Sequence, residues 1–390
     1  MTHHPDHPPS LETLCAHAGS SRDEAFGSVT TPIYMTSTFT LDETGREREF
    51  HYTRMGNPTR AALERTLAAL EGGAGCVATA AGVAAETTVM HLFGSGTHVV
   101  SGNDIYGGTF RLFTKLFEKQ GFTFSFVDMS DSTNVERALR DDTRAIWIET
   151  PSNPLLRIVD IEAMCDVARG RGVTVIVDNT FATPCFQQPL RLGADIVVHS
   201  TSKYLNGHSD IIGGAVIAKT LETAKRVAEI ASWLGTTCSP FDAWAVLRGL
   251  RTLHVRMEAH QRNAMAMARF LLSRSEVMRV YYPGLPDHPK HDLAARQMSG
   301  SGGMVSFDLR GGKEAVFALF RNLRLFASAA SLGGIESLIE HPATLSHASM
   351  TPEARAAAGI TDGCVRISLG IESPDDLIED MKRGLEALRG

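Results

Sequence analysis

Short apolar runs alternate with longer stretches of helical spacing through the middle of the chain. The stretches between the runs repeat apolar residues at the period of an amphipathic helix. Alternation of this kind predicts an α/β fold built on a mainly parallel, doubly wound sheet. The runs of strand length are residues 97–101, 123–127, 145–149, 173–177, 195–199 and 212–218.

The last third of the chain has a different pattern. A long helical stretch after Pro240 predicts a connection between two domains. Strand signals at 304–309 and 365–369 precede a closing helix, for which we expect Ser373 as N-cap and Pro374 as first residue. We therefore predict an N-terminal arm at 1–56, a large domain at 57–255 and a smaller α/β domain at 256–390.

Polar side chains gather where two successive apolar runs end, and ligands bind at the carboxyl ends of parallel strands. One run ends at Asp178, and the next leads into His199-Ser200-Thr201-Ser202-Lys203. A lysine held partly out of water loses its proton readily and becomes a nucleophile toward carbonyl groups. With Ser200 and Ser202 as phosphate contacts and Asp178 on the pyridinium nitrogen, the pattern predicts a site for pyridoxal phosphate (PLP).

Four further residues at three places in the chain are candidates, and each place has a plainer alternative. Gly82 and Val83 open a helix-like segment whose N–H groups could hold a phosphate, although turn geometry alone would explain the glycine. Tyr106 could stack on a planar ring or be an ordinary core tyrosine. Arg366 lies in an apolar strand-like run, which indicates either a carboxylate ligand or a structural ion pair.

The order of these motifs resembles the Cys/Met-metabolism pyridoxal enzymes, in particular the cystathionine γ-synthases and cystathionine γ-lyases. The resemblance extends from about Leu14 to Leu388. It implies a fold-type I PLP enzyme, similar to aspartate aminotransferase, with a seven-stranded sheet domain. The matching segments are Tyr52-Thr53-Arg54, Leu70-Glu71-Gly72-Gly73, Tyr106-Gly107-Gly108-Thr109, Glu149-Thr150-Pro151-Ser152-Asn153-Pro154, Asp178-Asn179-Thr180-Phe181, the lysine motif, Ser331-Leu332-Gly333-Gly334 and Val365-Arg366-Ile367-Ser368.

The resemblance also implies roles for individual residues. Lys203 would form the Schiff base with PLP, and Asn153 would bond the phenolic oxygen of the cofactor. Arg366 would bind the substrate α-carboxylate and Ser331 would help to position it, while Asn153 would also contact the substrate. Arg111 could meet a distal carboxylate. The phosphate would also be bound by Tyr52 and Arg54 of a neighbouring subunit, so we expect a homo-oligomer, and by resemblance a homotetramer.

The implied reaction is γ-elimination or γ-replacement on a homoserine-derived or sulfur amino acid of transsulfuration, such as cystathionine or an O-acylhomoserine. Lys203 would remove the Cα proton and then a Cβ proton, while Tyr106 would transfer a proton at the leaving group. Two alternatives are a methionine γ-lyase-like enzyme and a non-catalytic regulatory or binding protein of the same fold.

Three positions separate these alternatives. The family usually has a glutamate where this chain has Ala330, and methionine γ-lyases have an apolar residue there. Methionine γ-lyases, however, typically have a cysteine where this chain has Gly108. Many synthases have a second arginine where this chain has Met55.

Composition narrows the class of protein further. The chain has 390 residues, 43% of them hydrophobic, and a net charge of −6, which offers no basic patch for nucleic acid. Without a membrane-length apolar stretch or a visible signal peptide we expect a cytoplasmic protein. The six cysteines form no C-x-x-C pair, and the histidine-containing start is typical of a disordered terminus, so no metal site is expected.

Overall fold

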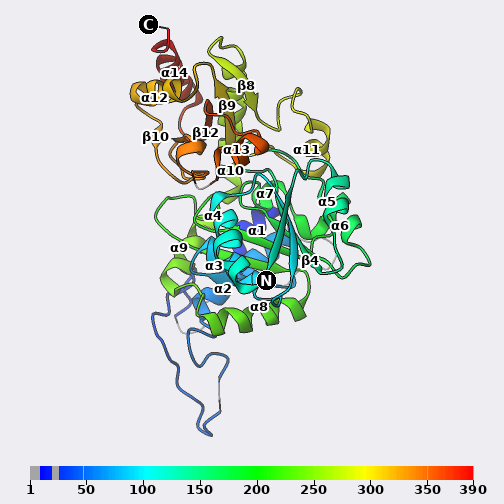
Figure 1. The fold of residues 1–390 in the computed structure, drawn as a ribbon. Coiled ribbons are helices and arrows are strands. Elements are labelled where there is room, and N and C mark those ends of the chain that lie inside the picture. Colours follow the sequence, from blue (N-terminus) through cyan, green and yellow to red (C-terminus); the bar gives the residue numbers. More distant parts are fainter. Residues whose placement is uncertain (1–8, 20–25, 47, 349, 390) are drawn as a thin grey trace.

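Two β-sheets organise the chain, with helices packed around them (Figure 1). In a computed structural model, the described residues are 9–19, 26–46, 48–348 and 350–389, and the histidine-containing start of the chain lies outside them. The larger sheet has seven strands in the order β1-β7-β6-β5-β4-β2-β3, and the smaller has five in the order β10-β11-β12-β9-β8.

The larger sheet confirms the predicted, mainly parallel arrangement. Strands β3, β2, β4, β5 and β6 run parallel in register, and β7 is antiparallel to both of its neighbours, β6 and β1. The six predicted runs differ from β2 to β7 by at most two residues at their ends, and the run at 123–127 coincides with β3; no run is predicted for β1. The strands are β1 (Gly75–Thr79), β2 (His98–Gly102), β3 (Thr123–Val127), β4 (Thr143–Glu149), β5 (Thr174–Asp178), β6 (Ile196–Ser200) and β7 (Gly214–Ala218).

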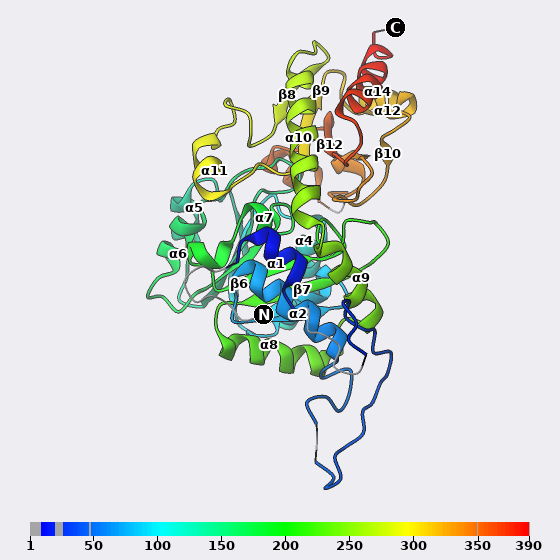
Figure 2. The same ribbon diagram turned by 180° about the vertical axis from the view of Figure 1, so that it is seen from behind.

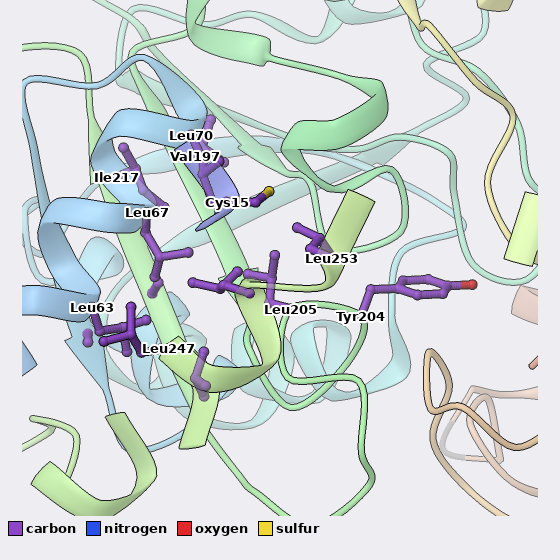
Figure 3. Close-up of a cluster of buried hydrophobic side chains, with 14 of the residues drawn as sticks. Cys15, Leu63, Leu67, Leu70, Val197, Tyr204, Leu205, Ile217, Leu247 and Leu253 are labelled. Atoms are coloured by element: carbon purple, nitrogen blue, oxygen red, sulfur yellow. The ribbon is translucent and has the colours of Figure 1, made fainter. Parts of the chain in front are cut away.

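Helices cover both faces of this sheet because its strands are apolar on both sides. Val197 of β6 belongs to a buried cluster with Leu63 and Leu67 of α2 (Pro58–Glu71), shown in Figure 3. The next residue, Val198, points to the other face and packs in a cluster with Val89 of α3 (Gly82–Met90). Each strand therefore contributes alternate residues to two separate cores.

The remaining helices of this part of the chain are mostly short. Helix α2 begins after Asn57, whose side chain accepts hydrogen bonds from the N–H groups of Thr59 and Arg60. The others are α1 (Leu11–His17), α4 (Gly107–Arg111), a π-helical turn (Leu112–Phe117), α5 (Ser132–Ala138), α6 (Ile161–Ala168), α7 (Thr183–Phe186), α8 (Leu221–Leu234), α9 (Pro240–Leu250) and 3-10 turns at Glu118–Gln120 and Pro189–Leu192.

The smaller sheet is formed by the last third of the chain. It is antiparallel except for the pair β10–β11. Its strands are β8 (Val277–Tyr281), β9 (Met304–Leu309), β10 (Ala327–Ser328), β11 (Leu338–Glu340) and β12 (Cys364–Ser368). Its helices are α11 (His291–Gln297), α12 (Gly312–Asn322), α13 (Pro352–Ala358) and α14 (Pro374–Glu386), with a 3-10 turn at Pro342–Thr344.

Helix α14 begins where the sequence predicts. Pro374 is its first residue and Ser373 occupies the N-cap position, but the Ser373 side chain makes no capping hydrogen bond. The expected side-chain cap is therefore wrong, although the predicted start is correct.

A long helix, α10 (Leu253–Leu272), connects the two sheets (Figure 1). Its first turns place Leu253 and Met257 in the core beneath the larger sheet, and its last turns place Met267 and Leu271 in the core beneath the smaller one. The domain boundary that we predict at residue 255 falls inside this helix and stays a prediction. None of the helices within the described residues is long and apolar enough to cross a membrane.

The N-terminal segment has two parts, of which one packs on the rest of the chain and the other is largely exposed. Helix α1 packs on α2 and α10, with Cys15 buried in the core (Figure 2). Residues 26–46 and 48–55 instead form a long loop whose middle extends away from the rest of the chain, while Tyr34 and Arg54 hydrogen-bond to Thr59 and Ser232. This loop leaves large apolar side chains in water, among them Phe26 and Val29, which are 93% and 88% exposed.

Candidate active site

A cavity of about 660 Å³ lies at the carboxyl ends of the parallel strands, where the two sheets meet. Residues from both sheets line it, because β11 and β12 face the ends of β4, β5 and β6. It brings together most of the residues singled out in the sequence: Gly82, Val83, Tyr106, Arg111, Asn153, Asp178, Ser200, Ser202, Lys203, Ala330, Ser331 and Arg366.

Lys203 lies in the turn after β6, with its amine inside the cavity. The Nζ atom donates a hydrogen bond to the Ser331 hydroxyl at 2.9 Å. Burial lowers the pKa of Lys203 to about 8, helped by the nearby Arg366 charge and opposed by Glu340. The side chain is therefore poised to lose its proton near neutral pH, as an amine nucleophile requires.

Asp178 ends β5 and lies half-buried on the cavity wall. Its carboxylate accepts a hydrogen bond from the backbone N–H of Thr180 at 2.9 Å. Burial raises the pKa of Asp178, whereas the Thr180 contacts and the charge of His199 lower it. On the neighbouring strand, the N–H of Ser200 donates to the Thr180 hydroxyl at 2.9 Å, so Thr180 connects the two strand ends.

The start of α3 approaches β6 closely. A Cβ atom added to Gly82 would lie 2.9 Å from the Cβ of Ser200, so any larger residue would push the two elements apart. The close approach places the first N–H groups of a nine-residue helix beside the Ser200 hydroxyl. Helix-start N–H groups and a hydroxyl together suit a phosphate.

Tyr106 precedes α4 and stands at the cavity mouth, 39% exposed. Its backbone N–H donates to the Glu149 carboxylate at 2.7 Å. Burial, and then the charge of Glu86, raise the pKa of the Tyr106 hydroxyl. A Cβ atom on Gly108 would lie 2.2 Å from the Tyr106 ring, so this ring position depends on glycine at 108.

Arg366 on β12 is buried and faces the cavity from the smaller sheet. Its Nη2 donates to the Ser331 carbonyl and its Nη1 to the Asn153 side-chain oxygen, each at 2.9 Å. Its Nη1 also lies 3.1 Å from the carboxylate of Glu340, directly opposite on β11. Among the described residues the buried Nε finds no acceptor, which leaves one donor for a carboxylate ligand.

Tyr52 and Arg54 lie outside this cavity. They line a separate cavity of about 500 Å³, and Arg54 Nη1 donates to the Ser232 carbonyl at 2.8 Å. Met55 beside them is 57% exposed. Their predicted contact with a phosphate in a neighbouring subunit stays a prediction.

Sequence reasoning missed three carboxylates of the cavity, which are Glu86, Glu336 and Glu340. Glu340 pairs with Arg366, and only strand register reveals it. Glu86 lies one turn after Gly82 and accepts a hydrogen bond from Thr109 at 2.9 Å. Burial and the charge of Asp178 raise the pKa of Glu86 to about 8. Glu86 could have been found in the sequence, because it is the one charged residue in the otherwise uncharged segment that opens this helix.

These residues fit PLP. The cavity offers an amine of lowered pKa, a carboxylate at a strand end, an aromatic ring and anion donors on two adjoining elements. The buried, unpartnered Nε of Arg366 adds a place for a carboxylate.

Comparison with known proteins decides the family. The model of the family "Cys/Met metabolism PLP-dependent enzyme" matches residues 12–386. The chain belongs to this family. It is similar to cystathionine γ-lyase of Bacillus subtilis, with 48% identity over 96% of this chain and 99% of the relative. It is also similar to cystathionine γ-synthase of Escherichia coli, with 46% identity over 96% of this chain and 97% of the relative.

Solved structures of similar proteins support the same family. Cystathionine γ-synthase of Xanthomonas oryzae in complex with cystathionine is 49% identical, with a TM-score of 0.96 over 98% of this chain and 99% of that one. The chain is therefore a PLP-dependent enzyme of transsulfuration with the fold that the resemblance implies. The alternative of a non-catalytic protein is set aside.

Proposed function

We propose that the protein catalyses γ-elimination or γ-replacement on cystathionine or an O-acylhomoserine. One observation carries this proposal: Lys203 and Arg366 meet at the same residue, Ser331. The Lys203 amine lies 2.9 Å from the Ser331 hydroxyl and Arg366 Nη2 lies 2.9 Å from the Ser331 carbonyl. An amino acid whose carboxylate binds Arg366 would therefore have its Cα close to the lysine amine.

The cofactor would be held by residues on both sides of the cavity. Asp178 would pair with the ring nitrogen, Tyr106 would stack on the ring and Asn153 would bond the phenolic oxygen. Gly82, Val83, Ser200 and Ser202 would bind the phosphate. When bound, PLP supplies an electron sink that stabilises negative charge at the substrate Cα.

The chain's own residues would then move protons. A lysine amine with a pKa of about 8 can accept the Cα proton, and next a Cβ proton, near neutral pH. The Tyr106 hydroxyl, with its raised pKa, stays protonated and can donate to the group that leaves from Cγ. The Ser331 hydroxyl holds the lysine amine between these transfers.

The position of Tyr106 favours the cystathionine enzymes over methionine γ-lyases. A Cβ atom at residue 108 would approach the Tyr106 ring to 2.2 Å, so the cysteine typical of methionine γ-lyases would displace this ring. Arg111 lines the same cavity and is available for the distal carboxylate of a longer substrate.

One observation favours methionine as a second candidate substrate. Ala330 lines the cavity next to Ala329, so this part of the wall is apolar where the cystathionine enzymes usually carry a glutamate. An apolar wall suits the thioether end of methionine better than a distal ammonium group.

The proposal includes a homo-oligomer, by resemblance a homotetramer, located in the cytoplasm. Tyr52 and Arg54 would complete the phosphate site of a neighbouring subunit. Support comes from the exposed loop that carries them, because its apolar side chains Val29 and Met35, which are 88% and 70% exposed, need a protein surface to cover them.

The test gives the PLP-loaded protein O-succinylhomoserine with and without cysteine and, in separate reactions, cystathionine or methionine. Cystathionine and 2-oxobutyrate are followed together by mass spectrometry. Accumulation of cystathionine identifies a γ-synthase. Formation of 2-oxobutyrate from cystathionine, without net synthesis, identifies a γ-lyase. Turnover of methionine in preference to both would replace the proposal by the second candidate.

A further inference from the structure

A buried carboxylate lies behind the cavity, at the end of α2. Glu71 belongs to the segment Leu70-Glu71-Gly72-Gly73, to which the proposed reaction gives no role. Its side chain is completely buried, and the neighbouring Leu70 packs in the apolar cluster beneath the larger sheet (Figure 3). A buried charge is expensive unless it is paired and hydrogen-bonded, so its partners indicate its purpose.

One oxygen of Glu71 binds two different strand ends. Its Oε1 accepts a hydrogen bond from Asn179 Nδ2 at 2.8 Å and another from His199 Nε2 at 2.6 Å. Both partners are also buried. Asn179 directly follows Asp178 of β5, and His199 directly precedes Ser200 of β6.

A third strand end joins the same network through Gln187. Gln187 Nε2 donates to the Asn179 side-chain oxygen and to the Thr150 carbonyl, each at 3.0 Å. Thr150 directly follows Glu149 at the end of β4. The carboxylate therefore connects, on the side of the sheet away from the cavity, the strands whose ends form its wall.

Strand sides explain why the two sets of residues are separate. Successive side chains of a strand point to opposite faces of the sheet. Asp178 and Ser200 line the cavity, while the side chains of their chain neighbours Asn179 and His199 reach Glu71, although His199 also borders the cavity. Movement of either neighbour would thus shift a residue of the cavity.

We propose that Glu71 is a positioning residue of the cofactor site: by binding Asn179 and His199 it fixes the distance between the Asp178 carboxylate and the Ser200 hydroxyl. The inference rests on the proposed roles of Asp178 and Ser200. The pyridine ring of PLP is rigid and its phosphate arm is short, so the ring nitrogen and the phosphate can both be bound well only within a narrow range of spacings.

The same network also affects the charge of Asp178. The charge of His199 lowers the pKa of Asp178, against the effect of burial, and so helps to keep that carboxylate ionised. The other carboxylates that face Asp178 are Glu86 and Glu149 in the cavity. Among these neighbours His199 is the one that lowers the pKa of Asp178, and Glu71 holds its ring in place through the 2.6 Å contact.

The experiment compares Glu71→Gln with the wild-type, full-length protein. The dissociation constant of PLP is measured by titrating the PLP-free protein and following the absorbance of the bound cofactor, and thermal unfolding is recorded without PLP. Glutamine keeps the size and one carbonyl oxygen but loses the negative charge that strengthens the hydrogen bonds from Asn179 and His199. We therefore expect the dissociation constant to rise about tenfold or more, as for other partners that orient a binding residue.

Asp380→Asn is the matched control for loss of a buried carboxylate. Asp380 is 2% exposed and accepts N–H groups of Arg324, Leu325 and Phe326 far from the cavity. This variant should unfold at a lower temperature yet bind PLP as wild type does. If Glu71→Gln behaves in the same way, Glu71 is merely structural and the proposal is overturned.

Two more variants complete the test. His199→Gln removes the imidazole that binds Glu71 and answers the question if Glu71→Gln does not fold. Asp178→Asn reports on the cofactor contact itself. If Asp178→Asn weakens PLP binding while Glu71→Gln and His199→Gln do not, only this inference fails; if Asp178→Asn has no effect, the proposed cofactor contacts fail with it.

Discussion

The side-chain amine of Lys203 lies 2.9 Å from the hydroxyl of Ser331, although 128 residues separate them in the chain. Lys203 follows a strand of the larger sheet, and Ser331 lies between two strands of the smaller one. The contact therefore joins the two halves of the cavity. Ser331 also has a φ of 131°, a region that favours glycine, and such strain is typical of functional positions.

Substitution of Ser331 separates strain from function. Ser331→Gly and Ser331→Ala both remove the hydroxyl, so both should lower turnover. Only the glycine variant relieves the strained backbone, and its free energy of unfolding should exceed that of the alanine variant by about 1–3 kcal/mol. Urea unfolding of both proteins checks this, and equal stability would show that the backbone is not strained.

Replacement of Lys203 should abolish catalysis. Loss of a positioned proton-transfer group lowers rates about 10²–10⁴-fold, and Lys203→Ala also loses the amine that binds the cofactor. The measurement is steady-state turnover of cystathionine at saturating PLP. Lys219→Ala is the control, because Lys219 lies away from the cavity and binds the Gly193 carbonyl. Activity above a few per cent in Lys203→Ala would remove the lysine from the mechanism.

Cofactor loading should depend on pH through the Lys203 amine. Its pKa is lowered from 10.5 to about 8, so the neutral, reactive amine becomes more abundant as pH rises and predominates above about 8. The rate at which PLP binds to the PLP-free protein should rise up to this pH and then level off. Stopped-flow absorbance measures it.

The control for that pH dependence is Arg366→Gln. After burial, the Arg366 charge is the second cause of the lowered pKa of Lys203. Removing this charge should move the plateau to higher pH. An unchanged plateau would mean that another group controls loading.

Substitution of Ala330 tests the choice of substrate. Ala330→Glu would place a carboxylate on the apolar wall of the cavity, where it can meet the distal ammonium of cystathionine. A charged hydrogen bond of this kind is worth about 1.5–3 kcal/mol, so kcat/KM for cystathionine should rise about tenfold relative to that for methionine. Equal effects on both substrates would remove Ala330 as a determinant of specificity.

Prediction from the sequence was most successful for site residues that lie close together in the chain. Apolar runs ending in Asp178 and in the Ser200–Lys203 turn located two walls of the cavity, because parallel strands end on one side of a sheet. Prediction was weaker at the helix caps. Ser373 has the right residue type and position for a cap, yet its side chain makes no capping bond.

By itself, the sequence determined the mainly parallel sheet and the residue types that a PLP site needs, because strand periodicity and strand-end motifs are local properties of the chain. Only the tertiary structure decided which charges meet. Glu340 faces Arg366 through strand register, and Glu71 reaches His199 across 128 residues of sequence. Such pairs are set by packing and by the dielectric of the interior, which no local pattern encodes.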